Sequence, residues 1–249
     1  MEAHGLAAFL KALEEAIRRA PEALGEDAFH IEEVLLPALR GLETCLKNSY
    51  GPEELSRSLL AHQLDSFANS LTWAQLSLVA GSCQLAFREL RWVMEQACRA
   101  RLLDVLYPHE EPGRKIARGV VLERKRRRVM PIGWRLVKKA LESLSGFRLE
   151  REERLRVRNV WRSLSRHVHS LPPGAGQAEL ARELNSASDV VCDLVLVLAL
   201  DAFPRARSCF ASFLSGRPWG SYLPMTYRFS GARPGRYSPS LSGRYSSTM

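Results

Sequence analysis

One helical segment of this chain carries an arginine and two histidines that are suited to phosphate chemistry. Residues 157–170 place Arg162 and His169 seven positions apart, with His167 between them. At about 100° per residue, Arg162 and His169 share one helix face, whereas His167 falls on the apolar side with Leu164. An imidazole can move protons near neutral pH, and a guanidinium can hold a phosphate or stabilise a charged transition state. Arg162 and His169 are therefore candidate catalytic residues.

Structural roles would also explain these histidines. His169 stands at a helix end, where it can meet the last carbonyl groups and the helix dipole. His167 is expected in the core or in an interface, because its neighbours on that face are apolar.

A second polar group lies on an earlier predicted helix. Arg88, Arg91 and Glu95 fall on one side of it, and Arg91 precedes Glu95 by four residues. This spacing favours an ion pair within the helix. Alternatively, the group forms the wall of a polar site that faces the helix of Arg162, so that arginines of two helices bind a phosphodiester.

The charge excess of the chain is concentrated in one segment. The 249 residues have a formal net charge of +9, yet residues 114–139 alone hold eleven lysines or arginines against Glu123, a net charge of +10. A basic balance of this kind favours polyanionic partners. The expected nucleic-acid-binding residues are Arg124, Lys125, Arg126, Arg127, Arg128, Lys138 and Lys139. A solvated surface and a nuclear-localisation signal are the alternatives.

The apolar pattern has a helical period through most of the chain and indicates no strand. We predict an all-α fold, a helical bundle of long antiparallel helices. Residues 1–50 form N-terminal helices that pack on a main bundle at 51–215, of which 114–139 are a basic insert, and residues 216–249 form a disordered tail. The tail has five arginines and no acid, and its aromatic residues either stack on unpaired bases or belong to a solubilising end.

Several local features refine this bundle. Pro37 should kink or split the second helix. Two long antiparallel helices should follow between Glu53 and Tyr107, with the bend near residues 69–72. Residues 178–203 become apolar on all sides and should lie at the centre of the bundle.

The five cysteines are odd in number, widely spaced and without a C-x-x-C motif. We expect small core residues rather than zinc ligands or disulfides, and hence a reduced, cytoplasmic setting. The N-terminus lacks the pattern of a signal peptide, and the apolar run at 190–200 is too short to span a membrane. Neither a metal nor a cofactor motif is present, so the expectation is no metal, no cofactor and no membrane partner.

Two segments carry a resemblance to known proteins. They are Gly81-x5-Phe87-Arg88-Glu89-Leu90-Arg91-Trp92-x2-Glu95 and Leu164-Ser165-x2-Val168-His169-Ser170-x-Pro172. Both resemble a group of uncharacterised helical proteins, chiefly archaeal, over roughly residues 70–205. More distantly, the Arg-x4–6-His helix is similar to the HEPN superfamily. That resemblance implies a metal-independent ribonuclease with a composite site in a homodimer, although some members are inactive scaffolds. The motif here would be Arg162 with His169 or, less well placed, His167.

The sequence thus predicts a cytoplasmic helical protein that works on or with nucleic acid, RNA in preference to DNA. The leading hypothesis is a HEPN-like endoribonuclease in which Arg162 holds the phosphate and His169 transfers a proton or stabilises charge. Cleavage would use the RNA 2′-OH. The alternatives are a non-catalytic module that binds nucleic acid or ribonucleoprotein, and a protein-interaction scaffold.

Overall fold

The computed structural model describes residues 29–125, 133–146, 148–170 and 176–233, and near the N-terminus residues 8, 11, 12 and 14–19 in a helix. No strand occurs in these ranges, so the predicted all-α fold is confirmed. The basic residues Arg126, Arg127 and Arg128 lie outside them, as does the end of the predicted tail, 234–249.

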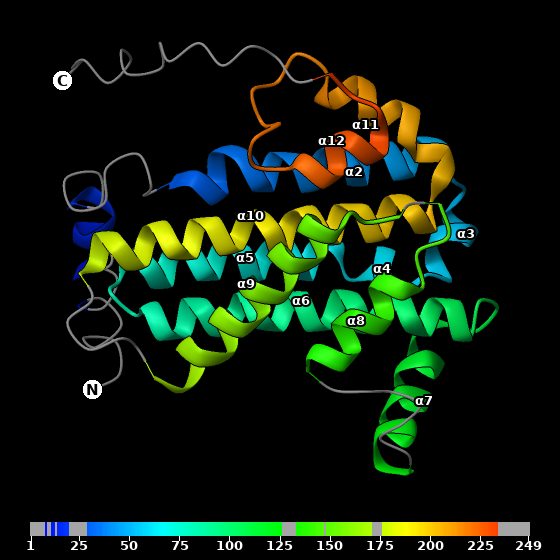
Figure 1. The fold of residues 1–249 in the computed structure, drawn as a ribbon, viewed down its shortest axis with the longest axis horizontal. Helices are drawn as coiled ribbons and strands as arrows, with labels where there is room; N and C mark the ends of the chain where they lie inside the picture. The colour runs from blue at the N-terminus through cyan, green and yellow to red at the C-terminus, as the bar shows by residue number, and fades with distance from the viewer. Residues whose placement is uncertain are drawn as a thin grey trace.

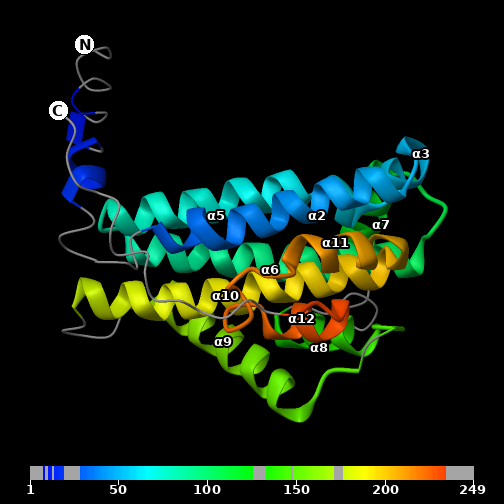
Figure 2. The ribbon, with the colours of Figure 1, turned by 90° about the horizontal axis from the view of Figure 1, so that it is seen from above.

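Two long helices, α6 (Cys83–Leu106) and α10 (Gln177–Ala202), form the centre of the bundle (Figures 1 and 2). They run in the same direction: the side-chain amide of Gln177 donates to the carbonyl of Leu78, just before α6, and Arg101 near the end of α6 pairs with Asp201. From Val190 to Asp201, every residue of α10 is buried. The prediction of a central, all-round apolar helix is confirmed.

The predicted antiparallel pair consists of α5 (Leu64–Val79) and α6. The expected bend near residues 69–72 is wrong, because α5 continues through it with Leu71 fully buried. The chain reverses at Gly81 instead, where φ is +77°. Glycine adopts this left-handed conformation without the steric cost that a Cβ would bring.

The helix that was expected to kink or split at Pro37 changes its hydrogen-bonding pattern there without a break in the helical backbone. A π-helical turn, η2 (Ile31–Leu35), precedes α2 (Leu36–Ser49), and Pro37 occupies the first turn of α2. Proline is tolerated there because that N–H has no partner within the helix. The short helices α3 (Pro52–Ser56) and α4 (Leu59–His62) then lead into α5.

Helices α8 (Trp134–Glu142) and α9 (Arg151–His169) lie across α6 and α10 on the side away from α2 (Figure 2). α9 runs antiparallel to α6, because the side chain of Gln84 donates to the carbonyl of Val168 and Trp161 Nε1 donates to Glu95. The helix begins with a capping box in which Glu150 and Glu153 accept backbone N–H groups.

α7 (Pro112–Lys125) projects from the end of α6 (Figure 1). Its base is fixed by Lys115, which is 1% exposed and donates to Asp104 at 2.7 Å and to the carbonyl of Arg57. Asp104 in turn accepts the N–H groups of Leu59 and Leu60 at the start of α4. One cation of the basic insert therefore has a structural role.

The C-terminal part contains η3 (Pro204–Ala206), α11 (Arg207–Leu214) and α12 (Pro224–Ser230). The prediction of disorder from Gly216 is wrong for residues 216–233, since α12 packs on α10 and buries Tyr227 and Phe229. The Arg217 guanidinium covers the rings of Phe213 and Trp219, at 4.3 and 4.6 Å. These aromatic side chains pack within the fold and are therefore not available to stack on bases.

A disulfide joins Cys45 of α2 to Cys209 of α11, with 5.6 Å between the Cα atoms. The prediction of five unpaired core cysteines is therefore wrong for this pair, whose members are 164 residues apart in the sequence. Cys83, Cys98 and Cys192 are free and buried, as expected. No helix of the described ranges is long and apolar enough to cross a membrane, and no cluster of metal-ligating side chains occurs in them.

Candidate nucleic-acid interface

The outer face of α9 carries an arginine at nearly every turn. Successive members are three or four residues apart and fall within roughly 120° of the helix surface at about 100° per residue. They are Arg151, Arg154, Arg158, Arg162 and Arg166, all exposed, and we call them the arginine ridge. Their spacing corresponds to a cation about every 4.5–6 Å along the helix, at 1.5 Å of rise per residue.

The ridge is not neutralised by the acids of its own helix. Glu150 and Glu153 at the start of α9 pair with Arg228 of α12. In the described part of the chain, no ridge arginine forms an ion pair with an acid. Glu152, exposed in the first turn, lies at the edge of the ridge. The result is a row of solvated cations, which is suited to a polyanion.

A groove of about 680 Å³ lies beside the first half of the ridge, between α8 and α9. Its apolar lining comes from Trp134, Leu141, Leu149 and Leu155, and its cations are Lys138, Arg148, Arg151, Arg154 and Arg158. Three of these cations also belong to the ridge, so the two surfaces are continuous. We call this cavity the α8–α9 groove.

Each of the two acids of the groove has a partner. Glu142 lies 3.7 Å from Lys138, and Glu150 lies 3.5 Å from Arg228. Four arginines of the groove remain without an acid among the described residues. The groove therefore combines an apolar floor with a cationic rim.

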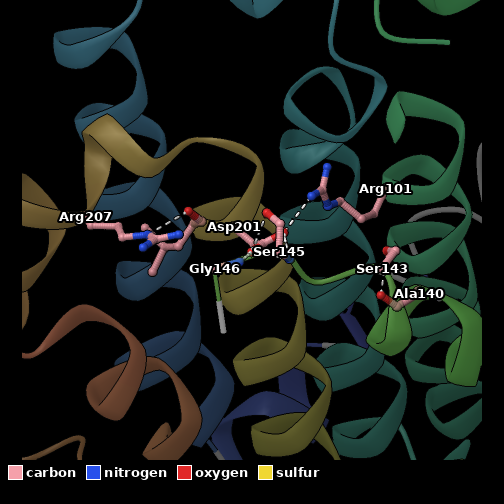
Figure 3. A network of polar contacts seen from close by, with 8 residues as sticks. Arg101, Ala140, Ser143, Ser145, Gly146, Asp201 and Arg207 are labelled. Carbon is pink, nitrogen blue, oxygen red and sulfur yellow. Dashed lines mark hydrogen bonds and ion pairs between the residues drawn. The ribbon is translucent and has the colours of Figure 1, made fainter. Parts of the chain in front are cut away.

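The loop between α8 and α9 sets the shape of the groove, and Asp201 of α10 holds that loop (Figure 3). Its side chain is fully buried and accepts the N–H groups of Ser145 and Gly146, at 3.0 and 2.7 Å. Arg101 of α6 donates to the same carboxylate at 2.6 Å. One buried acid thus ties α6, α10 and the α8–α9 loop together.

The candidate catalytic residues Arg162 and His169 are both exposed on the ridge side of α9. Seven residues of helix separate them by roughly 10 Å along the axis. This separation is measured between backbone positions, and both residues have long side chains that project from the same face. They share a face, as the periodicity predicted, and their pairing as a catalytic site stays a prediction.

His167 lies in the core, as expected. It is 1% exposed and stacks on Phe87 of α6 with 4.3 Å between ring centroids. Its Nδ1 is 2.9 Å from the carbonyl oxygen of Ser163, so this nitrogen carries the hydrogen. Its Nε2 is 3.3 Å from Glu183 of α10 but lacks hydrogen-bond geometry.

Ser163, His167 and Glu183 have the residue types of a hydrolase triad but not its arrangement. The Ser163 hydroxyl donates to Glu183 at 2.5 Å, and the imidazole donates to a backbone carbonyl. The histidine is therefore not positioned to take a proton from the serine. The group holds α9 against α10.

The second polar group behaves mainly as an ion pair within α6. Arg91 donates to Glu95 at 3.1 Å, and Trp161 of α9 approaches the same oxygen at 3.4 Å. Arg91 also lies 5.9 Å from the Trp161 ring, whereas Arg88 is exposed and 3.9 Å from Glu89. Arg91 and Glu95 thus face α9, but they contact a tryptophan there rather than the ridge arginines.

The predicted basic patch is only partly described. Arg124 and Lys125 end α7, which projects away from α9, whereas Lys138 lines the α8–α9 groove. Lys139, on the same turn of α8 as Lys138, is half-buried. Lys138 is therefore a member of this set that joins the groove.

Sequence reasoning missed Arg151, Arg154, Arg148 and Trp134. The two ridge residues could have been found by extending the helical period of Arg158 and Arg162 back to the start of the helix. Trp134 and Arg148 lie beside α9 because α8 and α9 both pack on α6 and Asp201 holds the intervening loop, and no local pattern indicates that arrangement.

Comparison with known protein families, curated proteins and solved structures finds no match to this chain.

Proposed function

We propose that this protein binds nucleic acid, RNA in particular, along the arginine ridge of α9. The observation that carries the proposal is the row of five exposed arginines, one per turn, without acid partners among the described residues. Arginine recognises phosphate through a planar, multidentate donor group, and a row of them can follow a phosphate backbone. The continuous groove with Lys138 extends the cationic surface.

Binding of a fluorescently labelled RNA, followed by anisotropy at several salt concentrations, tests this proposal. Arg162→Ala with Arg166→Ala should weaken binding, because both residues lie on the ridge and outside the groove. The matched control is Arg40→Ala with Lys47→Ala on α2, on the other side of α10 (Figure 2), which removes the same charge. An equal loss of RNA affinity in both double variants would mean that binding depends on the net charge of the protein and not on the ridge.

A second candidate is the endoribonuclease that the HEPN resemblance implies, and the exposure of His169 on the same face as Arg162 favours it. In that reaction the 2′-oxygen attacks the adjacent phosphorus as a base takes its proton. The 5′-oxygen leaves and is protonated, which produces a 2′,3′-cyclic phosphate. The composite site that the resemblance implies would place Arg162 of one copy with His169 of the other copy in a homodimer.

RNA cleavage in EDTA by the wild type and His169→Ala tests catalysis separately from binding. Loss of cleavage with unchanged binding would support the enzyme. Salt-sensitive binding without cleavage would support a non-catalytic module, and the absence of both would support a protein scaffold.

A further inference from the structure

We propose that the α8–α9 groove holds an unpaired nucleobase of a single strand whose phosphates follow the arginine ridge. This inference rests on the proposed function and adds the class of nucleic acid, namely single strands in preference to duplexes. It follows from the chemistry of the groove, from its continuity with the ridge and from the position of Trp134.

The groove has the composition that a base with its phosphate requires. Its floor is apolar, whereas its rim offers Arg148, Arg151, Arg154 and Arg158. A volume of about 680 Å³ is within the range of roughly 300–1,000 Å³ that small-ligand sites occupy. Arg154 and Arg158 are members of both surfaces, so a strand bound on the ridge passes the mouth of the groove.

Trp134 is a fixed aromatic surface on the lining. It is half-buried and packs against the core, with its ring 6.2 Å from that of Trp161. Gly133 before it has a φ of +60°, and a Cβ at this position would lie 3.2 Å from the Trp161 ring. Trp161 is itself held by Glu95 and Arg91 of α6. Aromatic side chains bind bases of single strands by stacking, with little dependence on sequence.

Duplex RNA does not offer an unstacked base. Its phosphates could still lie on the ridge, so duplex binding should occur without the contribution of the groove. The proposal therefore predicts a difference between single and double strands that depends on the ring of Trp134.

The test compares a single-stranded RNA of mixed sequence, its duplex, and a single strand of equal length with abasic residues. Trp134→Leu should weaken binding of the ordinary single strand about 5- to 150-fold, from the usual effect of removing one stacking contact. Binding of the duplex and of the abasic strand should be unchanged. Trp134→Phe, which retains a ring, should bind nearly as the wild type does, and so should Trp73→Leu, which removes a largely exposed tryptophan of α5.

Should Trp134→Leu fail to fold, Arg148→Ala provides a second variant, because this exposed residue lies on the rim of the groove. It should lower affinity for the single strand more than for the duplex. Equal affinity of the wild type for both forms, or no effect of either variant, would overturn the role of the groove and leave ridge binding intact. No salt-sensitive binding to any of the three nucleic acids would overturn the proposed function as well.

Discussion

Asp193 lies fully buried in α10 and binds the start of α12, accepting the N–H groups of Met225 and Thr226 at 2.9 and 2.7 Å. Burial raises the pKa of Asp193 to about 7, against the opposing effect of these hydrogen bonds. An unfolded aspartate titrates near pH ~3.9. Between these two pH values Asp193 is therefore protonated in the folded protein and ionised in the unfolded chain.

This difference predicts a pH dependence of stability. Because the folded state binds the extra proton, the free energy of unfolding should fall as pH rises from about 4 to 7, by at most about 1.4 kcal/mol per pH unit for this group. Asp193→Asn should flatten this slope in denaturant titrations across that range. Asp65→Asn, at an exposed acid of α5, is the control and should leave the slope unchanged. If the free energy of unfolding of Asp193→Asn falls with pH as steeply as that of the wild type, the raised pKa of Asp193 is contradicted.

Asp201 makes a second residue-level prediction. Its carboxylate and Arg101 are both buried, and the same carboxylate holds the loop that shapes the α8–α9 groove (Figure 3). Asp201→Asn leaves a buried guanidinium without its counter-charge, which typically costs about 3–5 kcal/mol. Urea denaturation should show this loss. Glu53→Gln, at the exposed pair with Arg57, should have little effect, and an equally small effect at Asp201 would contradict the structural role.

At the scale of elements, α11 is held to α2 by the disulfide between Cys45 and Cys209. Thiol titration in denaturant without reductant should therefore find three free thiols, and five after reduction. In the folded protein the free thiols should react slowly, since burial raises the pKa of Cys98 and Cys192 well above that of an exposed thiol. A count of five before reduction would contradict the pairing.

Loss of this disulfide should destabilise the protein. A cross-link over so long a separation, 164 residues, is expected to stabilise by about 2–5 kcal/mol. Cys45→Ala with Cys209→Ala should lower the melting temperature of the oxidised protein, and reductant should have no further effect on that variant. If the melting temperature of the wild type is the same with and without reductant, that result would be evidence against the cross-link.

The sequence predicts best those elements that depend on a local pattern of residues and not on contacts with distant segments. α9 and α10 follow from helical periodicity and continuous apolar character, and the change from η2 to α2 beside Pro37 follows from the geometry of proline. α12 was missed because a segment rich in serine, glycine and arginine is stabilised by a few long-range contacts. Tyr227 bonds the carbonyls of Leu214 and Arg217, and Asp193 binds the first turn.

At the scale of the whole molecule, the sequence predicts one part of the candidate site, the cationic face of α9, but not the α8–α9 groove. The cationic face of α9 is visible in its sequence as a period, whereas the groove depends on how α8 and α9 meet. Both helices pack on α6, and the loop between them is bound to Asp201, 55 residues further along the chain than Gly146. The charge of residues 114–139 does not all belong to an exposed basic surface. Lys115 is buried against Asp104 and stabilises the fold.

The endoribonuclease hypothesis makes a prediction for two copies of the chain. If Arg162 of one copy works with His169 of the other, Arg162→Ala and His169→Ala should each be inactive, and their equimolar mixture should regain part of the cleavage. A gel assay of RNA cleavage in EDTA measures this directly. A mixture as inactive as its components, at concentrations where the wild type cleaves, would exclude the composite site.

The central claim is that the arginine ridge of α9 contacts phosphates. The salt dependence of single-stranded RNA binding tests it most directly, because each phosphate contact contributes about −0.7 to the slope of log K against log salt concentration. Arg162→Ala with Arg166→Ala should reduce the magnitude of this slope by roughly 1.4, the value for two lost contacts. The control pair Arg40→Ala with Lys47→Ala should retain the wild-type slope. An unchanged slope in the ridge variant, or wild-type binding that does not weaken with salt, would contradict the account.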